Sequence, residues 1–130
     1  MTGLDTNVLI RYILRDHPAQ SAKASELVER FTEIDPGFIS AVAMVETAWV
    51  LENVYGFPDD AVAAAIERIL QIDVLVVEHR LEVYLAMASV KQRRGAFADA
   101  LIGAIGTRSG CSRTLTFDRK VSRLPGFELL

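Results

Sequence analysis

The segment Val74-Leu75-Val76-Val77 is a short run of aliphatic residues with no polar residue between them. Such a run is typical of a central parallel strand that is covered on both faces. Apolar residues at helical spacing come before it, in residues 62–70, and after it, in residues 81–88 (Leu81, Tyr84, Leu85 and Ala88). A strand between two amphipathic helices is the repeating unit of α/β proteins, so we expect that fold class.

The rest of the chain repeats this alternation. We expect further short strands at residues 1–4, 38–39, 114–117 and 127–129. We expect further helices from Thr6 or Asn7 onward, over residues 19–34, from Ser40 to Val54 or Tyr55, and from about residue 98 to Gly110. This order predicts a parallel sheet with helices on both faces. The chain has 130 residues with no internal repeat or linker, so we expect a single domain, 1–130.

Composition restricts the class and location of the protein. Hydrophobic residues make up 51% of the chain and charged residues 24%, which indicates a globular protein. Cys111 is the only cysteine, so an intrachain disulfide is excluded and a reducing compartment is expected. No signal peptide and no apolar run of membrane-spanning length is present. We therefore expect a cytoplasmic protein with no membrane association.

Charge is distributed unevenly along the chain. Residues 1–90 hold six Lys/Arg and fourteen Asp/Glu, a net charge of −8, whereas residues 91–130 hold eight and three, a net charge of +5. The basic residues of the second part are Lys91, Arg93, Arg94, Arg108, Arg113, Arg119, Lys120 and Arg123. Each is most simply a solvated surface charge, but their clustering is also consistent with a rim that attracts phosphates.

Four carboxylates, Asp5, Glu46, Asp99 and Asp118, lie in or directly after apolar segments. Acidic side chains are rarely buried unless they are paired or bind a cation. Taken singly, each has a structural explanation, such as a helix cap, a first-turn acid or a solvent-facing position. Asp5 and Asp118 each follow a predicted strand, and the carboxyl ends of parallel strands meet at one edge of a sheet. We therefore expect the four acids to converge on one site.

Four adjacent carboxylates repel one another, and a divalent cation relieves that repulsion. An oxygen-only ligand set favours Mg²⁺ or Mn²⁺ over zinc. Thr6, Asn7 and Thr116 are placed to orient the carboxylates from a second layer. Gly103 and Gly106, which follow Asp99, allow either close approach of substrate or tight helix–sheet packing.

Four segments of the chain resemble the PIN-domain family of metal-dependent nucleases, and within it the VapC-type toxin ribonucleases of type II toxin–antitoxin pairs. The segments are Leu4-Asp5-Thr6-Asn7-Val8-Leu9-Ile10, Val45-Glu46-Thr47, Phe97-Ala98-Asp99-Ala100-Leu101-Ile102 and Leu115-Thr116-Phe117-Asp118. Their order and separations span nearly the whole chain.

The resemblance implies a three-layer α/β/α sandwich around a short-stranded parallel sheet of order 3-2-1-4-5. It implies Mg²⁺ or Mn²⁺ at an acidic site and cleavage of RNA phosphodiester bonds. It also implies a homodimer and a cognate antitoxin protein that covers the acidic groove. By position, Asp5, Glu46, Asp99 and Asp118 become the catalytic metal-site residues, and Thr116 a polar neighbour of Asp118.

For the mechanism, we expect Asp5 and Asp99 to hold the cation most directly, with Glu46 and Asp118 completing its surroundings. One acid would deprotonate the attacking water, and the sequence does not indicate which. Arg11, Arg119 or Lys120 would steer the RNA backbone into the site.

The sequence also leaves other functions open. A phosphatase of the haloacid-dehalogenase kind normally has a second Asp two residues after the first, where this chain has Asn7. A receiver domain would need paired acids after its first strand and a Lys beside the site, which Asp5-Thr6 and Lys120 match poorly. The main alternative is a non-catalytic PIN-like module that binds RNA or protein.

Overall fold

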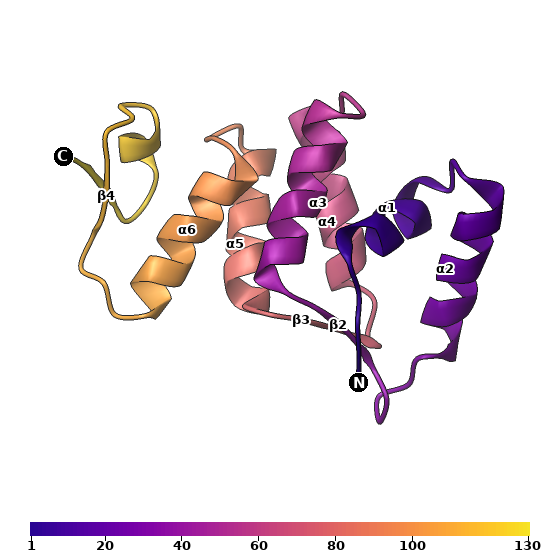
Figure 1. The fold of residues 1–130 in the computed structure, drawn as a ribbon. Helices are drawn as coiled ribbons and strands as arrows, with labels where there is room; N and C mark the ends of the chain where they lie inside the picture. Colours follow the sequence, from indigo (N-terminus) through magenta and orange to yellow (C-terminus); the bar gives the residue numbers. More distant parts are fainter.

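The computed structural model describes all 130 residues and confirms an α/β chain of alternating strands and helices (Figure 1). The elements are β1 (Thr2–Gly3), α1 (Thr6–Leu14), α2 (Pro18–Arg30), β2 (Gly37–Ile39), α3 (Ala41–Asn53), α4 (Asp59–Leu70), β3 (Leu75–Val77), α5 (Arg80–Lys91), α6 (Phe97–Arg108), β4 (Thr114–Thr116), the 3₁₀ turn η1 (Val121–Arg123) and β5 (Phe127–Leu129).

Helix starts follow the capping residues in the sequence. The Asp5 carboxylate accepts the backbone N–H of Thr6 at 2.8 Å and begins α1. Ser40 Oγ accepts the N–H of Ala43 at 3.1 Å and begins α3. The expected helix over residues 19–34 was too long, because α2 ends at Arg30. Phe31 adopts an extended conformation there and turns its ring into the core, against Gly37.

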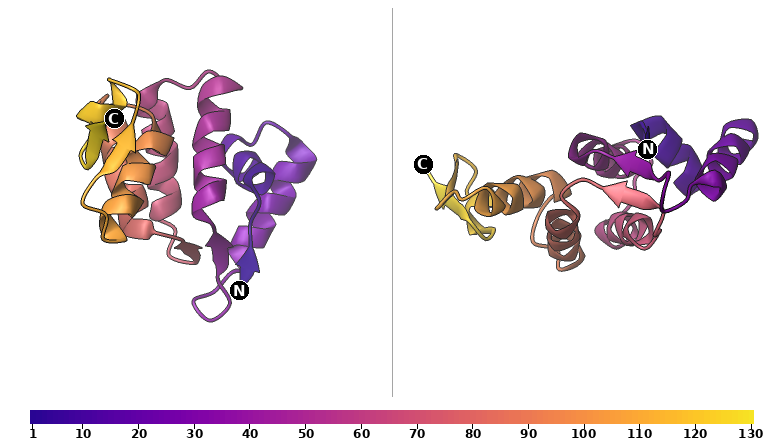
Figure 2. Two further views of the ribbon diagram at one scale, coloured as in Figure 1. Left: turned by 60° about the vertical axis from the view of Figure 1, so that its left-hand side comes forward. Right: turned by 90° about the horizontal axis from the view of Figure 1, so that it is seen from below.

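Strands β1, β2 and β3 form a parallel sheet in that order, with β2 in the centre. Helices α1 and α3 lie over one face of this sheet and α4 lies on the other (Figure 2, right). The strand at Leu75–Val77 is confirmed, but its predicted central position is wrong. It forms an edge of the sheet and leaves Val76 42% exposed, because β1 and β2 occupy the other two positions.

Strands β4 and β5 form a separate parallel pair. The neighbours β3-β2-β1 and β4-β5 agree with the expected order 3-2-1-4-5, but the pairing of β1 with β4 that would join them into one sheet is not made. Close packing against α6 keeps β4 and β5 away from β1. A Cβ at Gly103 would lie 2.5 Å from the Phe127 ring, and one at Gly106 would lie 2.7 Å from Thr114 Oγ1. The two glycines therefore serve helix–strand packing.

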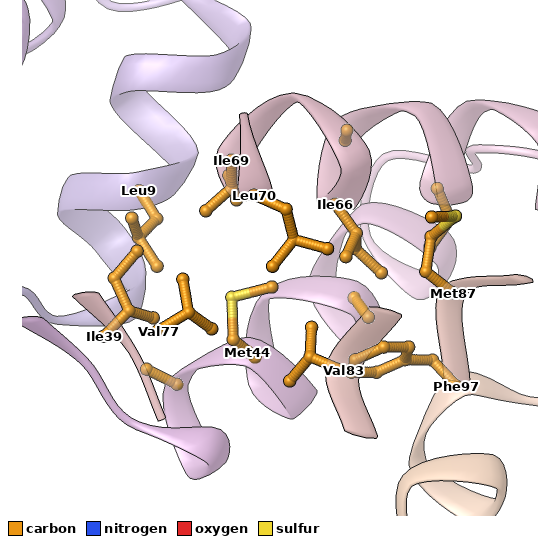
Figure 3. Close-up of a cluster of buried hydrophobic side chains, with 14 of the residues drawn as sticks. Leu9, Ile39, Met44, Ile66, Ile69, Leu70, Val77, Val83, Met87 and Phe97 are labelled. Carbon is orange, nitrogen blue, oxygen red and sulfur yellow. The ribbon is translucent and has the colours of Figure 1, made fainter. Parts of the chain in front are cut away.

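The hydrophobic core lies between the helices and the three-stranded sheet (Figure 3). It includes Leu9 of α1, Ile39 of β2 and Met44 of α3, all at most 1% exposed. In α5 the predicted apolar face of Leu81, Tyr84, Leu85 and Ala88 was wrong, because its three large side chains are exposed. The buried face is Val83, Ala86, Met87 and Val90, which α5 turns toward the core that it shares with α4. None of the helices combines the length and apolar character that crossing a membrane requires.

Candidate active site

The site begins where β1 ends and α1 starts. Asp5 lies two residues beyond β1 and caps α1, so its carboxylate is fixed at the N-terminal end of a helix. One oxygen, Oδ1, accepts the N–H of Thr6, and no protein donor reaches Oδ2. The positive end of the helix dipole stabilises a carboxylate in this position. Asp5 therefore presents a free carboxylate oxygen to a ligand.

Glu46 of α3 lies across a shallow pocket from this helix start. The pocket has a volume of about 270 Å³ and lies between α1 and α3. Its lining residues are Asp5, Thr6, Asn7, Ile10, Arg11, Glu46, Val50, Val54 and Tyr55. The structure thus brings two of the four predicted acids together, although they are 41 positions apart, with the predicted neighbours Thr6 and Asn7 beside them.

Asp99 and Asp118 do not line this pocket. Asp99 lies in the first turn of α6, where it is partly buried. Asp118 follows β4 and is exposed, and its Oδ1 accepts the N–H groups of Lys120 at 2.8 Å and Val121 at 3.2 Å. The predicted neighbour Thr116 does contact Asp118, since its Oγ1 accepts the Asp118 N–H at 3.1 Å.

No three His, Cys, Asp or Glu side chains are close enough together in this structure to hold a metal ion. The pocket nevertheless contains a donor set suited to a hard cation, with two carboxylates, an amide and a hydroxyl. Magnesium is commonly bound through one or two carboxylates while it retains several waters. The donor types of Asp5 and Glu46 therefore suit a hard divalent cation such as Mg²⁺ or Mn²⁺, and the other two acids do not line the pocket.

Comparison with protein families gives a match to the PIN domain over residues 4–126. The chain belongs to the PIN-domain family. No curated protein matches it. PIN domains are generally nucleases and typically bind divalent metal ions, so this chain has a nuclease-like fold. The resemblance found from the four acidic segments is confirmed at the level of the family.

In this PIN domain, Arg11 forms the basic wall of the pocket. Its guanidinium donates hydrogen bonds to Gln20 Oε1 at 2.8 Å, to Asp16 Oδ1 at 3.1 Å and to the Tyr55 hydroxyl at 3.3 Å. The hydrogen bond to Tyr55 has the largest effect and raises the pKa of Arg11. Desolvation lowers this pKa, and the hydrogen bond and charge of Asp16 raise it. The net shift is upward, so Arg11 stays charged throughout the accessible pH range.

Sequence reasoning did not identify Tyr55 as part of the site. Its hydroxyl accepts from Arg11 and donates to Asp16 Oδ2 at 3.2 Å, which links α3 to the loop after α1. The sequence predicted a helix up to Val54 or Tyr55, but α3 ends at Asn53, so helical periodicity does not give the direction of the Tyr55 side chain. Only the path of the chain after Asn53 places it at the pocket.

The other predicted RNA-binding residues, Arg119 and Lys120, lie with Asp118 on the β4–β5 side of the PIN domain. Both are exposed, and neither lines the pocket of Asp5 and Glu46. The structure therefore divides the predicted site into two parts, one at the start of α1 and one at the end of β4.

Proposed function

We propose that this chain is a Mg²⁺- or Mn²⁺-dependent endoribonuclease that hydrolyses RNA phosphodiester bonds, with the whole chain, 1–130, forming one PIN domain. The observation that supports the proposal is the pocket that Asp5 and Glu46 both line, together with Asn7 and Arg11. Membership of a family of nucleases supports the same chemistry. We also propose that Asp99 and Asp118 belong to this site in the active protein.

Each residue has a role that follows from its place. Asp5 and Glu46 would hold the cation, and Thr6 and Asn7 would orient the two carboxylates. The cation would supply positive charge to the scissile phosphate and help to activate water. Asp16 and Tyr55 hold the Arg11 guanidinium by hydrogen bonds. Arg11 would therefore attract the phosphate backbone without forming an ion pair with Asp5 or Glu46. Arg119 and Lys120 would attract the same backbone from the side of Asp118.

The biological role that we propose is that of a VapC-type toxin in a toxin–antitoxin pair. It would act in the cytoplasm as a homodimer, and a cognate antitoxin protein would neutralise it. If so, expression of the chain alone should arrest the growth of a bacterial host, and Asp5→Asn should relieve the arrest. Growth arrest that persists in the Asp5→Asn variant at equal protein level would contradict this role.

The decisive experiment is cleavage of a structured RNA pool by the purified protein with EDTA, Mg²⁺ or Mn²⁺. Glu46→Gln should reduce cleavage at least 100-fold, which corresponds to about 2.7 kcal/mol of transition-state stabilisation. Glu52→Gln is the matched control, because Glu52 is an exposed glutamate of the same helix outside the pocket, and it should retain full activity. Equal activity in the two variants would refute the assignment of Glu46.

A second function, a non-catalytic PIN module that binds RNA or protein, is favoured by one observation. In this structure, only two of the four acids line the pocket. Calorimetry with Mn²⁺ and a filter-binding assay with RNA separate the two functions. Binding without metal-dependent cleavage would favour the non-catalytic module, whereas cleavage that requires Glu46 would exclude it.

A further inference from the structure

Trp49 is the single tryptophan of the chain, and it lies on the surface of α3. It is 59% exposed. A tryptophan ring carries a large apolar area whose burial is favourable, so leaving it in water is costly. Neither the hydrophobic core nor the pocket of Asp5 and Glu46 includes Trp49, so neither the fold nor the acidic site explains its exposure.

Trp49 belongs to an open, mostly apolar hollow that adjoins the pocket of Asp5 and Glu46. This Trp49 hollow has a volume of about 520 Å³, and its lining residues all come from the same face of α3, namely Ala41, Val42, Val45, Glu46 and Trp49. Glu46 lines both the Trp49 hollow and the pocket that it shares with Asp5. A ligand that extends from that pocket past Glu46 therefore meets the Trp49 ring.

Helix geometry fixes the distance between Glu46 and Trp49. The two residues are three positions apart in α3, so their side chains are neighbours on the helix surface, with about 5–6 Å between their Cβ atoms. Successive nucleotides of a stacked strand are about 3.4 Å apart. The distance from Glu46 to Trp49 therefore spans one or two nucleotides. With the scissile phosphate at a cation held by Asp5 and Glu46, a base next to it reaches Trp49.

The chemistry and the size of the Trp49 hollow favour a nucleobase as its occupant. Its only charged group is the Glu46 carboxylate, and no Lys or Arg lines it, so it suits an uncharged aromatic group and not a phosphate. A standard protein–protein interface uses about 20–30 residues from each partner. The Trp49 hollow offers five residues of one helix, which is enough for one base, since base stacking requires only one exposed aromatic face.

We propose that Trp49 stacks against an unpaired base of the RNA next to the scissile phosphate, with Val42 and Val45 packed beside that base. The inference rests on the proposed nuclease function, because it takes the scissile phosphate to lie at the cation of Asp5 and Glu46. Both faces of a base inside a duplex are covered by its neighbours, so the RNA must be single-stranded at this position. Trp49 therefore makes the enzyme selective for unpaired RNA.

Tryptophan fluorescence tests the stacking without any assay of activity, because the chain has no other tryptophan. Stopped-flow mixing with a short single-stranded RNA in Mg²⁺ measures binding before product accumulates. This RNA should quench the emission of Trp49, whereas an abasic oligomer of equal length and charge should not. Equal quenching by the abasic oligomer would overturn the proposal, and so would RNA binding by anisotropy without quenching. Emission that changes when the free protein is diluted would overturn it too, since a second copy would then cover Trp49.

Substitutions separate aromatic stacking from simple apolar contact. Trp49→Leu keeps an apolar side chain without the ring, and it should raise KM for single-stranded RNA at least about 5-fold, the equivalent of about 1 kcal/mol, with kcat unchanged. Trp49→Phe keeps a ring and should stay within about 2-fold of the wild type. Tyr84→Leu is the matched control, because Tyr84 is 52% exposed on α5 and lines neither the Trp49 hollow nor the pocket of Asp5 and Glu46.

The two assays separate failure of the stacking from failure of the nuclease function. An unchanged KM in Trp49→Leu protein that still cleaves RNA would overturn the stacking and leave the nuclease function standing. Quenching of the wild type by RNA that it does not cleave would overturn the nuclease function and leave the stacking standing. Wild-type protein that neither binds nor cleaves RNA would overturn both.

Discussion

Substitution of Gly103 by alanine tests the packing that holds the β4–β5 pair, and with it Asp118, against α6. Two effects oppose one another. Alanine in a helix interior is more favourable than glycine by about 1 kcal/mol. The new Cβ, however, would lie 2.5 Å from Phe127 Cε2 and 3.2 Å from the backbone oxygen of Pro125. Forcing an extra methyl group into a packed contact costs about 1–3 kcal/mol, and this contact is among the tighter ones. We expect a net destabilisation of about 1–2 kcal/mol.

The expected destabilisation disappears when the Phe127 ring is removed. In a Phe127→Ala background the 2.5 Å contact is gone and only the 3.2 Å approach to the Pro125 oxygen remains, so helix propensity should make Gly103→Ala neutral to stabilising, by up to about 1 kcal/mol. Gly106→Ala is the matched control in the wild-type background. Its Cβ would meet only Thr114 Oγ1, which can rotate away, so the free energy of unfolding should stay equal or rise.

Urea unfolding followed by circular dichroism at 222 nm measures these differences. All variants must be compared at one protein concentration, since the stability of a protein that self-associates depends on concentration. Gly103→Ala that stabilises the wild type, or that has the same effect with and without the Phe127 ring, would refute the reasoning. That result would mean that α6 does not hold the β4–β5 pair through this contact.

Three further predictions concern α1, α3 and the core. Asp5→Asn should bind Mn²⁺ at least 10-fold more weakly by calorimetry but keep its stability, because the amide oxygen can still accept the Thr6 N–H. Asp5→Ala should in addition lose the cap and about 1 kcal/mol of the free energy of unfolding. Ser40→Ala should lower the free energy of urea unfolding by about 1 kcal/mol, since Ala43 N–H loses its acceptor, and an unchanged midpoint would contradict that capping role. Leu101→Ala should destabilise the protein by about 2–5 kcal/mol, because Leu101 is 2% exposed; a change below 1 kcal/mol would show that its surroundings collapse freely.

Local signals in the sequence predicted the elements well. Ser40 marked a helix start, the helix expected from residue 19 begins at Pro18, and the strands at 38–39 and 127–129 lie where the structure has β2 and β5. These features depend on neighbours in the chain, through capping hydrogen bonds and the fixed φ of proline. The faces of the elements were harder to predict. The apolar residues Leu81, Tyr84 and Leu85 have helical spacing, yet they are exposed, because the position of a helix in the fold decides which of two apolar faces is buried.

The sequence by itself determined the fold class and the family and singled out four candidate acids, because these follow from residue type and spacing. Only the tertiary structure decided which acids share a pocket. Asp5 and Glu46 line one pocket because α3 packs against α1, while Asp118 lies apart because Phe127 and Thr114 fix its strand pair to the glycines of α6. Such contacts depend on how elements pack across long sequence separations, and no local pattern encodes them.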